Sequence, residues 1–184
     1  MKDKSSLSIM IGLIFLGVMS RVIPHAPNFT PVGATALFAG ALLKPKWISF
    51  AIPMMVLWLS DLFLNNVVYK NQFPPIYSGW SWMGDLFVYI GFVTIVLIGN
   101  WIIRKIRFRQ LFIASLLASV SFYLITNFGV WYHSTVWPQN LNGLLACYAF
   151  ALPFFMNTIA ADLLFTGILF GIYSYYQIRV KQLA

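Results

Sequence analysis

The chain has 184 residues, of which 60% are hydrophobic and only 9% are charged. Soluble domains carry about a quarter charged residues, so this composition excludes an ordinary soluble domain and indicates a protein whose solvent is lipid. The net charge of +8 is compatible with a nucleic-acid surface only until the basic residues are placed along the chain.

Charge-free apolar runs predict six membrane helices in one membrane domain that covers residues 1–184. A spanning helix needs about 20 mostly apolar residues, so six spans leave only short connections. The first run resembles a signal peptide, but no small-x-small cleavage site follows it, which favours a retained helix. The predicted helices cover about 7–22, 32–43, 47–64, 82–103, 111–126 and 154–178, with a short segment over 144–152.

Two of these boundaries depend on residues that disfavour a regular helix. The polar and turn-forming stretch Asn127–Gly129 is expected to end the fifth helix. Pro153 is expected to mark either a kink or a break before the sixth helix.

The basic residues predict the orientation of the helices, because Lys and Arg are enriched in cytoplasmic loops. With the N-terminus inside, all but Arg21 and Lys70 of the 12 basic residues fall on the cytoplasmic side. A division into five or seven helices scatters them over both sides. We therefore expect an all-α integral membrane protein with six transmembrane helices and both termini in the cytoplasm. The positive charge is then a topology signal, and no nucleic-acid partner is expected.

The same division collects the other polar groups on the outer side. Asp61, Asp85, Asp162, His25 and His133 all fall there, together with most of the Trp and Tyr residues of the connections. Small-molecule sites are concave, largely apolar and lined by a few polar groups. The asymmetry therefore predicts a cavity that is open to the outside.

The three acidic residues have different expected roles. An ionised Asp162 would cost roughly 2.5 to 3.5 kcal/mol at the bilayer centre, so it needs a partner: Arg21, a hydrogen bond from a neighbouring helix, or a substrate. Asp61 lies nearer the interface, and we expect it to contact substrate. Asp85 begins a helix, where a carboxylate interacts favourably with the helix dipole, so we expect a structural cap.

Histidine and cysteine give no sign of an intrinsic metal centre or disulfide. His25 lies between two prolines and could bind a ligand or a metal, but no H-x-x-x-H pair accompanies it and Cys147 is alone. Gly33, Ala36 and Gly40 share one face of the second helix, and small residues of this kind allow helices to pack closely.

Several segments together resemble a family of bacterial transport proteins, which is itself similar to the substrate-binding S-components of energy-coupling-factor (ECF) vitamin transporters. The resemblance rests on Arg21–Gly40 with its Pro-His-x-Pro-Asn-Phe block, Ser60–Leu62, Thr126–Trp131, and Pro153–Asn157 with Asp162. The nearest characterised relatives that it indicates are the solitary cobalamin S-components of the BtuM type.

This resemblance implies an S-component-like bundle in the bacterial inner membrane, with a vitamin site open to the exterior and an ECF energising module as a partner. It also implies that His25 and Asp61 line a corrinoid pocket, with His25 as a candidate cobalt ligand. The cobalt-binding cysteine of BtuM-type proteins has no counterpart between Asn65 and Trp82, which excludes thiolate ligation there.

The sequence thus predicts a binding or transport protein, not an enzyme, for uptake of a vitamin-sized molecule, with cobalamin or another corrinoid as the first candidate substrate. Two alternatives stay open: a membrane enzyme that uses Asp61 and His25 on an amphiphilic substrate, and a structural membrane subunit. The predicted substrate-binding residues are His25, Asn28, Phe29, Asp61, Tyr77, Asn127, Trp131 and Asp162.

Overall fold

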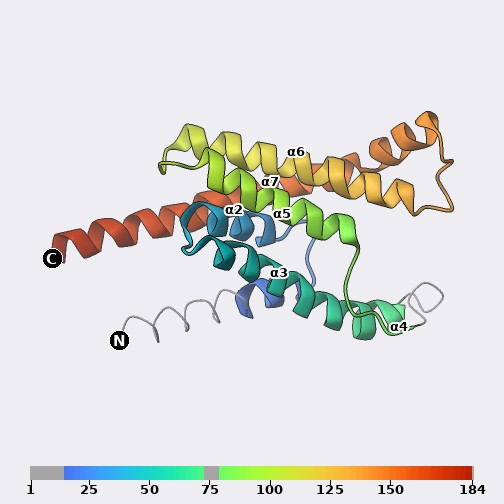
Figure 1. Ribbon diagram of the computed structural model, residues 1–184, viewed down its shortest axis with the longest axis horizontal. Helices are drawn as coiled ribbons and strands as arrows, with labels where there is room; N and C mark the ends of the chain where they lie inside the picture. The colour runs from blue at the N-terminus through green and yellow to red at the C-terminus, as the bar shows by residue number, and fades with distance from the viewer. Residues whose placement is uncertain (1–14, 73–78, 184) are drawn as a thin grey trace.

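The computed structural model describes residues 15–72 and 79–183, and every regular element within them is a helix (Figure 1). A helix over residues 15–22 comes first, and the part of the first predicted helix before residue 15 lies outside the described residues. The other elements are α2 (Val32–Leu42), α3 (Lys46–Phe63), the π-helical η1 (Leu64–Tyr69), α4 (Lys70–Gln72), α5 (Leu86–Ile102), α6 (Phe108–Tyr132) and α7 (Leu141–Leu183).

Three helical stretches are long and apolar enough to cross a membrane: Lys46–Gln72, Phe108–Tyr132 and Leu141–Ile178. The helices α2 and α5 are apolar but shorter. Large apolar side chains lie on the outer faces of the long helices; Leu124 on α6 is 49% exposed and Leu164 on α7 is 50% exposed. Soluble monomers rarely expose extended apolar surfaces, so this exterior suits a membrane protein.

The basic connections lie together at one end of the bundle. The α2–α3 connection, the α5–α6 connection and the C-terminal end of α7 all lie at the left in Figure 1. Lys44 belongs to the first connection and Lys46 begins α3, and Arg104, Lys105 and Arg107 belong to the second connection. That these segments face the cytoplasm, as the distribution of basic residues predicts, stays a prediction.

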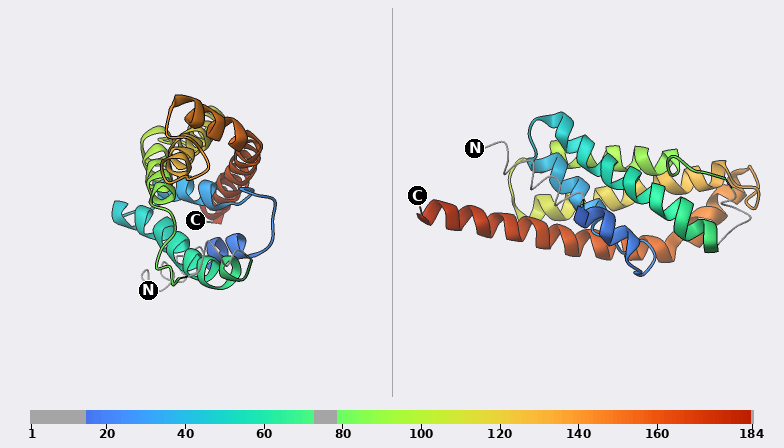
Figure 2. Two further views of the ribbon diagram at one scale, coloured as in Figure 1. Left: turned by 90° about the vertical axis from the view of Figure 1, so that its right-hand side faces the viewer. Right: turned by 90° about the horizontal axis from the view of Figure 1, so that it is seen from below.

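The helix α2 is short and lies at the centre of the bundle. Its 11 residues correspond to about 16 Å at 1.5 Å per residue. Its N-terminus therefore lies part-way along the longer helices, and so does the non-helical stretch 23–31 that leads into it (Figure 2).

Small residues allow α2 to approach its neighbours closely, as its composition predicted. The helix packs against α3, α5, α6 and α7, and Ala36 and Ala39 are buried. A Cβ atom added to Gly40 would collide with the carbonyl oxygen of Val96 on α5, and one added to Gly99 would collide with the carbonyl oxygen of Leu37. The backbones of α2 and α5 are thus in direct contact.

The helix α6 does not end at Asn127–Gly129, as the sequence had suggested, but continues to Tyr132. The side-chain amide of Asn127 donates to the Tyr123 carbonyl oxygen at 2.8 Å, one turn earlier, so it supports the helix. Gly129 is buried because the ring of Phe87 packs directly on it. Asn127 thus bonds within the helix and Gly129 allows close packing, so neither residue ends it.

The helix α7 runs without a break from Leu141 to Leu183, with Pro153 inside it. The predicted separate segment over 144–152 is its first part. Of the two expectations for Pro153, the break is wrong. Figure 2 shows α7 changing direction within its N-terminal, orange part, and a proline bends a helix because it lacks an N–H donor and its ring displaces a carbonyl group.

The contact between α2 and α5 leads to a stability prediction with a matched control. Gly99→Ala adds a methyl group against the Leu37 carbonyl, and overpacking of this kind costs about 1–3 kcal/mol. Gly171→Ala on α7 meets open space, so it should leave stability unchanged or raise it by about 0.5–1 kcal/mol. We expect the melting midpoint in detergent to fall only for Gly99→Ala; equal midpoints for the two variants would contradict this packing.

Candidate functional site: a cavity between two buried carboxylates

Arg21, at the end of the helix over residues 15–22, is bound by α3. Its Nη2 atom forms an ion pair with Asp61 Oδ1 at 2.8 Å. Its Nη1 atom donates to Ser60 Oγ at 2.5 Å and to the Leu57 carbonyl oxygen at 3.3 Å. These bonds attach the first helix, and the connection that follows it, to the last turns of α3.

Asp61 also accepts hydrogen bonds from the start of α5 and from the segment that leads into it. Its Oδ2 atom accepts hydrogen bonds from the Tyr89 hydroxyl at 2.9 Å and from the Gly84 backbone N–H at 3.1 Å. The residue is 5% exposed, and both of its carboxylate oxygens have partners. Asp61 therefore joins the first helix, α3 and the start of α5.

Asp162, on α7, has a different environment. It is 4% exposed, and its Oδ2 atom accepts a hydrogen bond from Ser119 Oγ on α6 at 2.7 Å. The sequence left two structural partners open for Asp162, namely Arg21 and a neighbouring helix. The structure shows the neighbouring helix, because Arg21 is bound to Asp61. Gly33, at the start of α2, lies directly against the Asp162 carboxylate and leaves no room for a side chain there.

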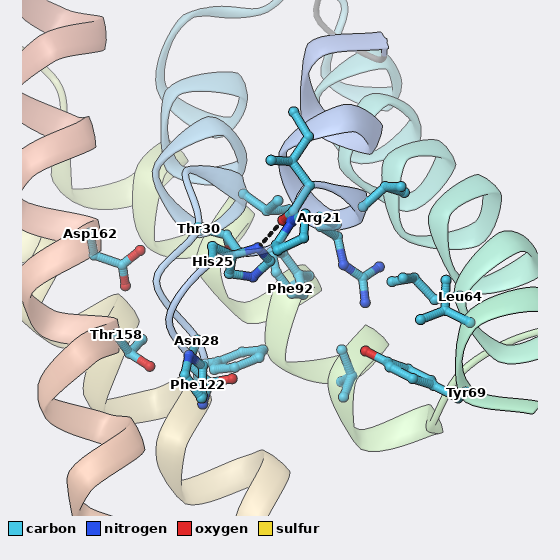
Figure 3. A pocket seen from close by; sticks show the side chains of 18 of the residues that line it. Arg21, His25, Asn28, Thr30, Leu64, Tyr69, Phe92, Phe122, Thr158 and Asp162 are labelled. Atoms are coloured by element: carbon cyan, nitrogen blue, oxygen red, sulfur yellow. Dashed lines mark hydrogen bonds between the residues drawn. The ribbon is translucent and has the colours of Figure 1, made fainter. Parts of the chain in front are cut away.

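A cavity of about 640 Å³ lies between these two carboxylates. Figure 3 shows Asp162 and Thr158 on one wall, Leu64 and Tyr69 on the opposite wall, and Arg21 and His25 between them. The rings of Phe92 and Phe122 belong to the apolar part of the wall, and their centroids lie 5.1 Å apart in an edge-to-face arrangement. The described lining residues are Arg21, Val22, Ile23, Pro24, His25, Pro27, Asn28, Thr30, Val32, Gly33, Leu64, Val68, Tyr69, Gln72, Val88, Phe92, Ile95, Phe122, Thr158 and Asp162.

The non-helical stretch 23–31 supplies a large part of that wall. His25 Nδ1 lies 2.6 Å from the Ile23 carbonyl oxygen, which fixes the imidazole ring. Asn28 has a positive φ of 61°, a conformation that asparagine adopts more readily than most residues. The Asn157 side chain donates to the Pro27 carbonyl oxygen at 2.9 Å, so α7 holds this stretch from the other side.

The structure therefore brings together three of the predicted substrate-binding residues, namely His25, Asn28 and Asp162, in the lining of one cavity. Asp61 and Phe29 are not among the described lining residues. Asp61 supports the wall through Arg21, and the Phe29 ring packs edge-to-face on Phe165 of α7 at 5.8 Å.

The remaining predicted site residues lie elsewhere. Asn127 bonds within α6, and the Trp131 indole N–H donates to the Pro138 carbonyl oxygen at 2.9 Å, which braces the α6–α7 connection. Tyr77 lies outside the described residues. Asp85 is the N-cap of α5, where its side chain accepts from the Phe87 N–H at 2.7 Å, as expected.

Sequence reasoning missed several polar members of the wall, among them Thr158, Thr30 and Gln72. Thr158 carried a usable signal: it lies four residues before Asp162, and such residues share one face of a helix. Thr30 and Gln72 carried none, because their place in the wall depends on how distant segments pack. Within the described ranges, no group of three or more His, Cys, Asp or Glu side chains could hold a metal ion.

These features describe an all-helical protein with long apolar helices and an open, partly polar cavity between them. The chain matches the family of unknown function DUF6580 over residues 1–183, and it therefore belongs to that family. No curated protein and no solved structure matches it.

The ion pair at Asp61 leads to a second stability prediction. Asp61→Asn leaves the Arg21 guanidinium without its counter-charge in a largely buried position, and breaking a buried pair costs about 3–5 kcal/mol. The control is Asp85→Asn, which alters an exposed contact between Asp85 and His133, 3.4 Å long, worth at most about 1 kcal/mol.

We expect Asp61→Asn to lower the melting midpoint in detergent, and Asp85→Asn to leave it close to that of the unaltered protein. If both substitutions had the same small effect, the Arg21–Asp61 contact would not hold the first helix in place.

Proposed function

We propose that this protein is a bacterial inner-membrane substrate-binding protein for the uptake of a vitamin-sized molecule, with six transmembrane helices like an S-component. The observation that carries the proposal is the cavity of about 640 Å³, because small-molecule sites have volumes of about 300–1,000 Å³ and combine apolar walls with a few polar groups.

The position of the stretch 23–31 supports a cavity of this kind. Non-helical backbone at membrane depth is tolerated only where protein buries it or where it lines a water-filled cavity. This stretch lies part-way along the bundle, and His25, Asn28 and Thr30 line the cavity. The basic connections lie at one end, which the positive-inside rule assigns to the cytoplasm. We place the mouth of the cavity on the opposite side of the membrane, which is the exterior.

The size of the cavity bears on the substrate. Pockets of this volume enclose drug-sized ligands, whereas a whole cobalamin, with its corrin ring and nucleotide tail, is larger and would extend beyond the walls. A corrinoid bound in part, with His25 as the cobalt ligand, remains the first compound to test. A smaller vitamin or precursor fits the enclosed volume better.

The two alternative functions receive less support. A general base must reach the proton that it removes, but both carboxylate oxygens of Asp61 accept bonds from Arg21, Tyr89 and Gly84. An acid–base pair of Asp61 and His25 is therefore not favoured. A structural subunit would need a free docking face on α2, whereas the small residues Ala36, Ala39 and Gly40 pack inside the bundle.

The binding proposal is tested by mass spectrometry of small molecules released from gently purified protein, and by calorimetry with cobalamin and smaller vitamins. Val88→Trp places a large ring in the cavity wall, so we expect it to lose most of the bound molecule. The control, Ile90→Trp, lies two residues along α5 at a position that is 43% exposed and should bind like the unaltered protein.

A monodisperse, unaltered protein that releases no small molecule and gives no heat with the panel would contradict the proposal. Equal binding by the two tryptophan variants would show that the ligand occupies another site.

A further inference from the structure

One oxygen of the Asp162 carboxylate has no hydrogen-bond partner among the described residues. Oδ2 accepts from Ser119, but Oδ1 accepts no bond there, and it is not one of the buried unpaired atoms, which are Ser115 Oγ and Thr166 Oγ1. Asp162 lines the cavity, and Figure 3 shows its carboxylate directed from α7 into that space. Oδ1 is thus an acceptor that a bound molecule can reach.

The positive charges around the cavity do not neutralise Asp162. Arg21 also lines the wall, but its guanidinium is paired with Asp61 at 2.8 Å. No described Lys, Arg or His forms an ion pair with Asp162. A buried carboxylate without a counter-charge is costly, so a cation bound in the cavity would stabilise the ionised form of Asp162.

His25 and Thr158, which line the same cavity as Asp162, also present hydrogen-bond acceptors to it. The Ile23 carbonyl can only accept, so His25 Nδ1 carries the proton in their 2.6 Å contact, and Nε2 of the neutral ring is then an acceptor. The Thr158 hydroxyl donates to the Phe154 carbonyl oxygen at 3.1 Å, which leaves its lone pairs free. Three polar groups that line the cavity therefore favour a ligand that donates hydrogen bonds.

The apolar wall adds a second requirement. The rings of Phe92 and Phe122 lie in the same cavity, and aromatic faces attract both planar rings and cations. An anionic ligand would lie beside the Asp162 carboxylate, while Arg21, the described lining residue with a permanent positive charge, is already paired with Asp61.

We infer that the cavity selects a small organic cation or an amino-substituted heteroaromatic ring, whose N–H groups bind Asp162 Oδ1. This inference rests on the proposed function and names the substrate class of the same site. Asp162 is the specificity-determining residue, and Ser119 orients its carboxylate.

The first experiment identifies the molecule released from the unaltered protein, from Asp162→Asn and from Asp85→Asn, by mass spectrometry. We expect a molecule with a basic or N–H-bearing nitrogen group. Hydrogen bonds to charged groups are worth enough that Asp162→Asn should reduce affinity by about ten- to a hundredfold. Asp85→Asn makes the same chemical change at a helix cap outside the cavity and should retain the molecule.

The second experiment keeps the inference testable if Asp162→Asn fails to fold. Calorimetry on the unaltered protein compares pyridoxamine, pyridoxine and 4-pyridoxic acid, which share one ring and differ in an ammonium, a hydroxyl and a carboxylate group. Among those that bind, the ammonium compound should bind best and the carboxylate compound worst.

The outcomes separate the two proposals. Protein that releases nothing and binds no vitamin or probe contradicts the proposed function, and the inference is rejected with it. A bound molecule without an N–H or cationic nitrogen, a preference for the carboxylate probe, or unchanged binding by folded Asp162→Asn overturns the inference alone.

Discussion

The structure depends on the ion pair between Arg21 and the buried carboxylate of Asp61, in a bundle that has few charges. An unpaired charge inside an apolar protein is costly, and the Arg21–Asp61 pair meets this constraint by joining the first helix to α3. The same carboxylate accepts from Tyr89 of α5. Arg21 lies in the last turn of the first helix. The Arg21–Asp61 pair therefore also fixes the start of the stretch 23–31, which lines the cavity.

The two buried aspartates have different surroundings, and the proposed function assigns ligand recognition to only one of them. Both oxygens of Asp61 have protein partners, so its contribution is to the fold. Asp162 has one bond from Ser119 and an oxygen directed into the cavity. Its remaining bonding capacity is available to a ligand. The two carboxylates thus differ in how many of their oxygens accept bonds from the protein, and this difference is the physical basis for proposing a structural role for Asp61 and a binding role for Asp162.

Much of the helical content follows from the sequence, because apolar runs between charged connections predict α2, α3 and α5 to within a few residues. The cap at Asp85 was likewise predictable from local chemistry. The length of α6 was not, since Asn127 and Gly129 are turn formers whose role here depends on Tyr123 and Phe87. Whether Asp162 would pair with Arg21 could not be decided from the sequence, because that choice depends on how helices far apart in the sequence pack.

The central claim is that the cavity lined by the stretch 23–31 opens on the side of the membrane opposite the basic connections. In a Cys147→Ala background, His25→Cys and Lys105→Cys each place one thiol at an exposed position, which a membrane-impermeant maleimide can label in intact cells. The account predicts labelling at position 25 from outside, and labelling at position 105 only after the membrane is opened. Labelling of both positions from the same side would contradict it.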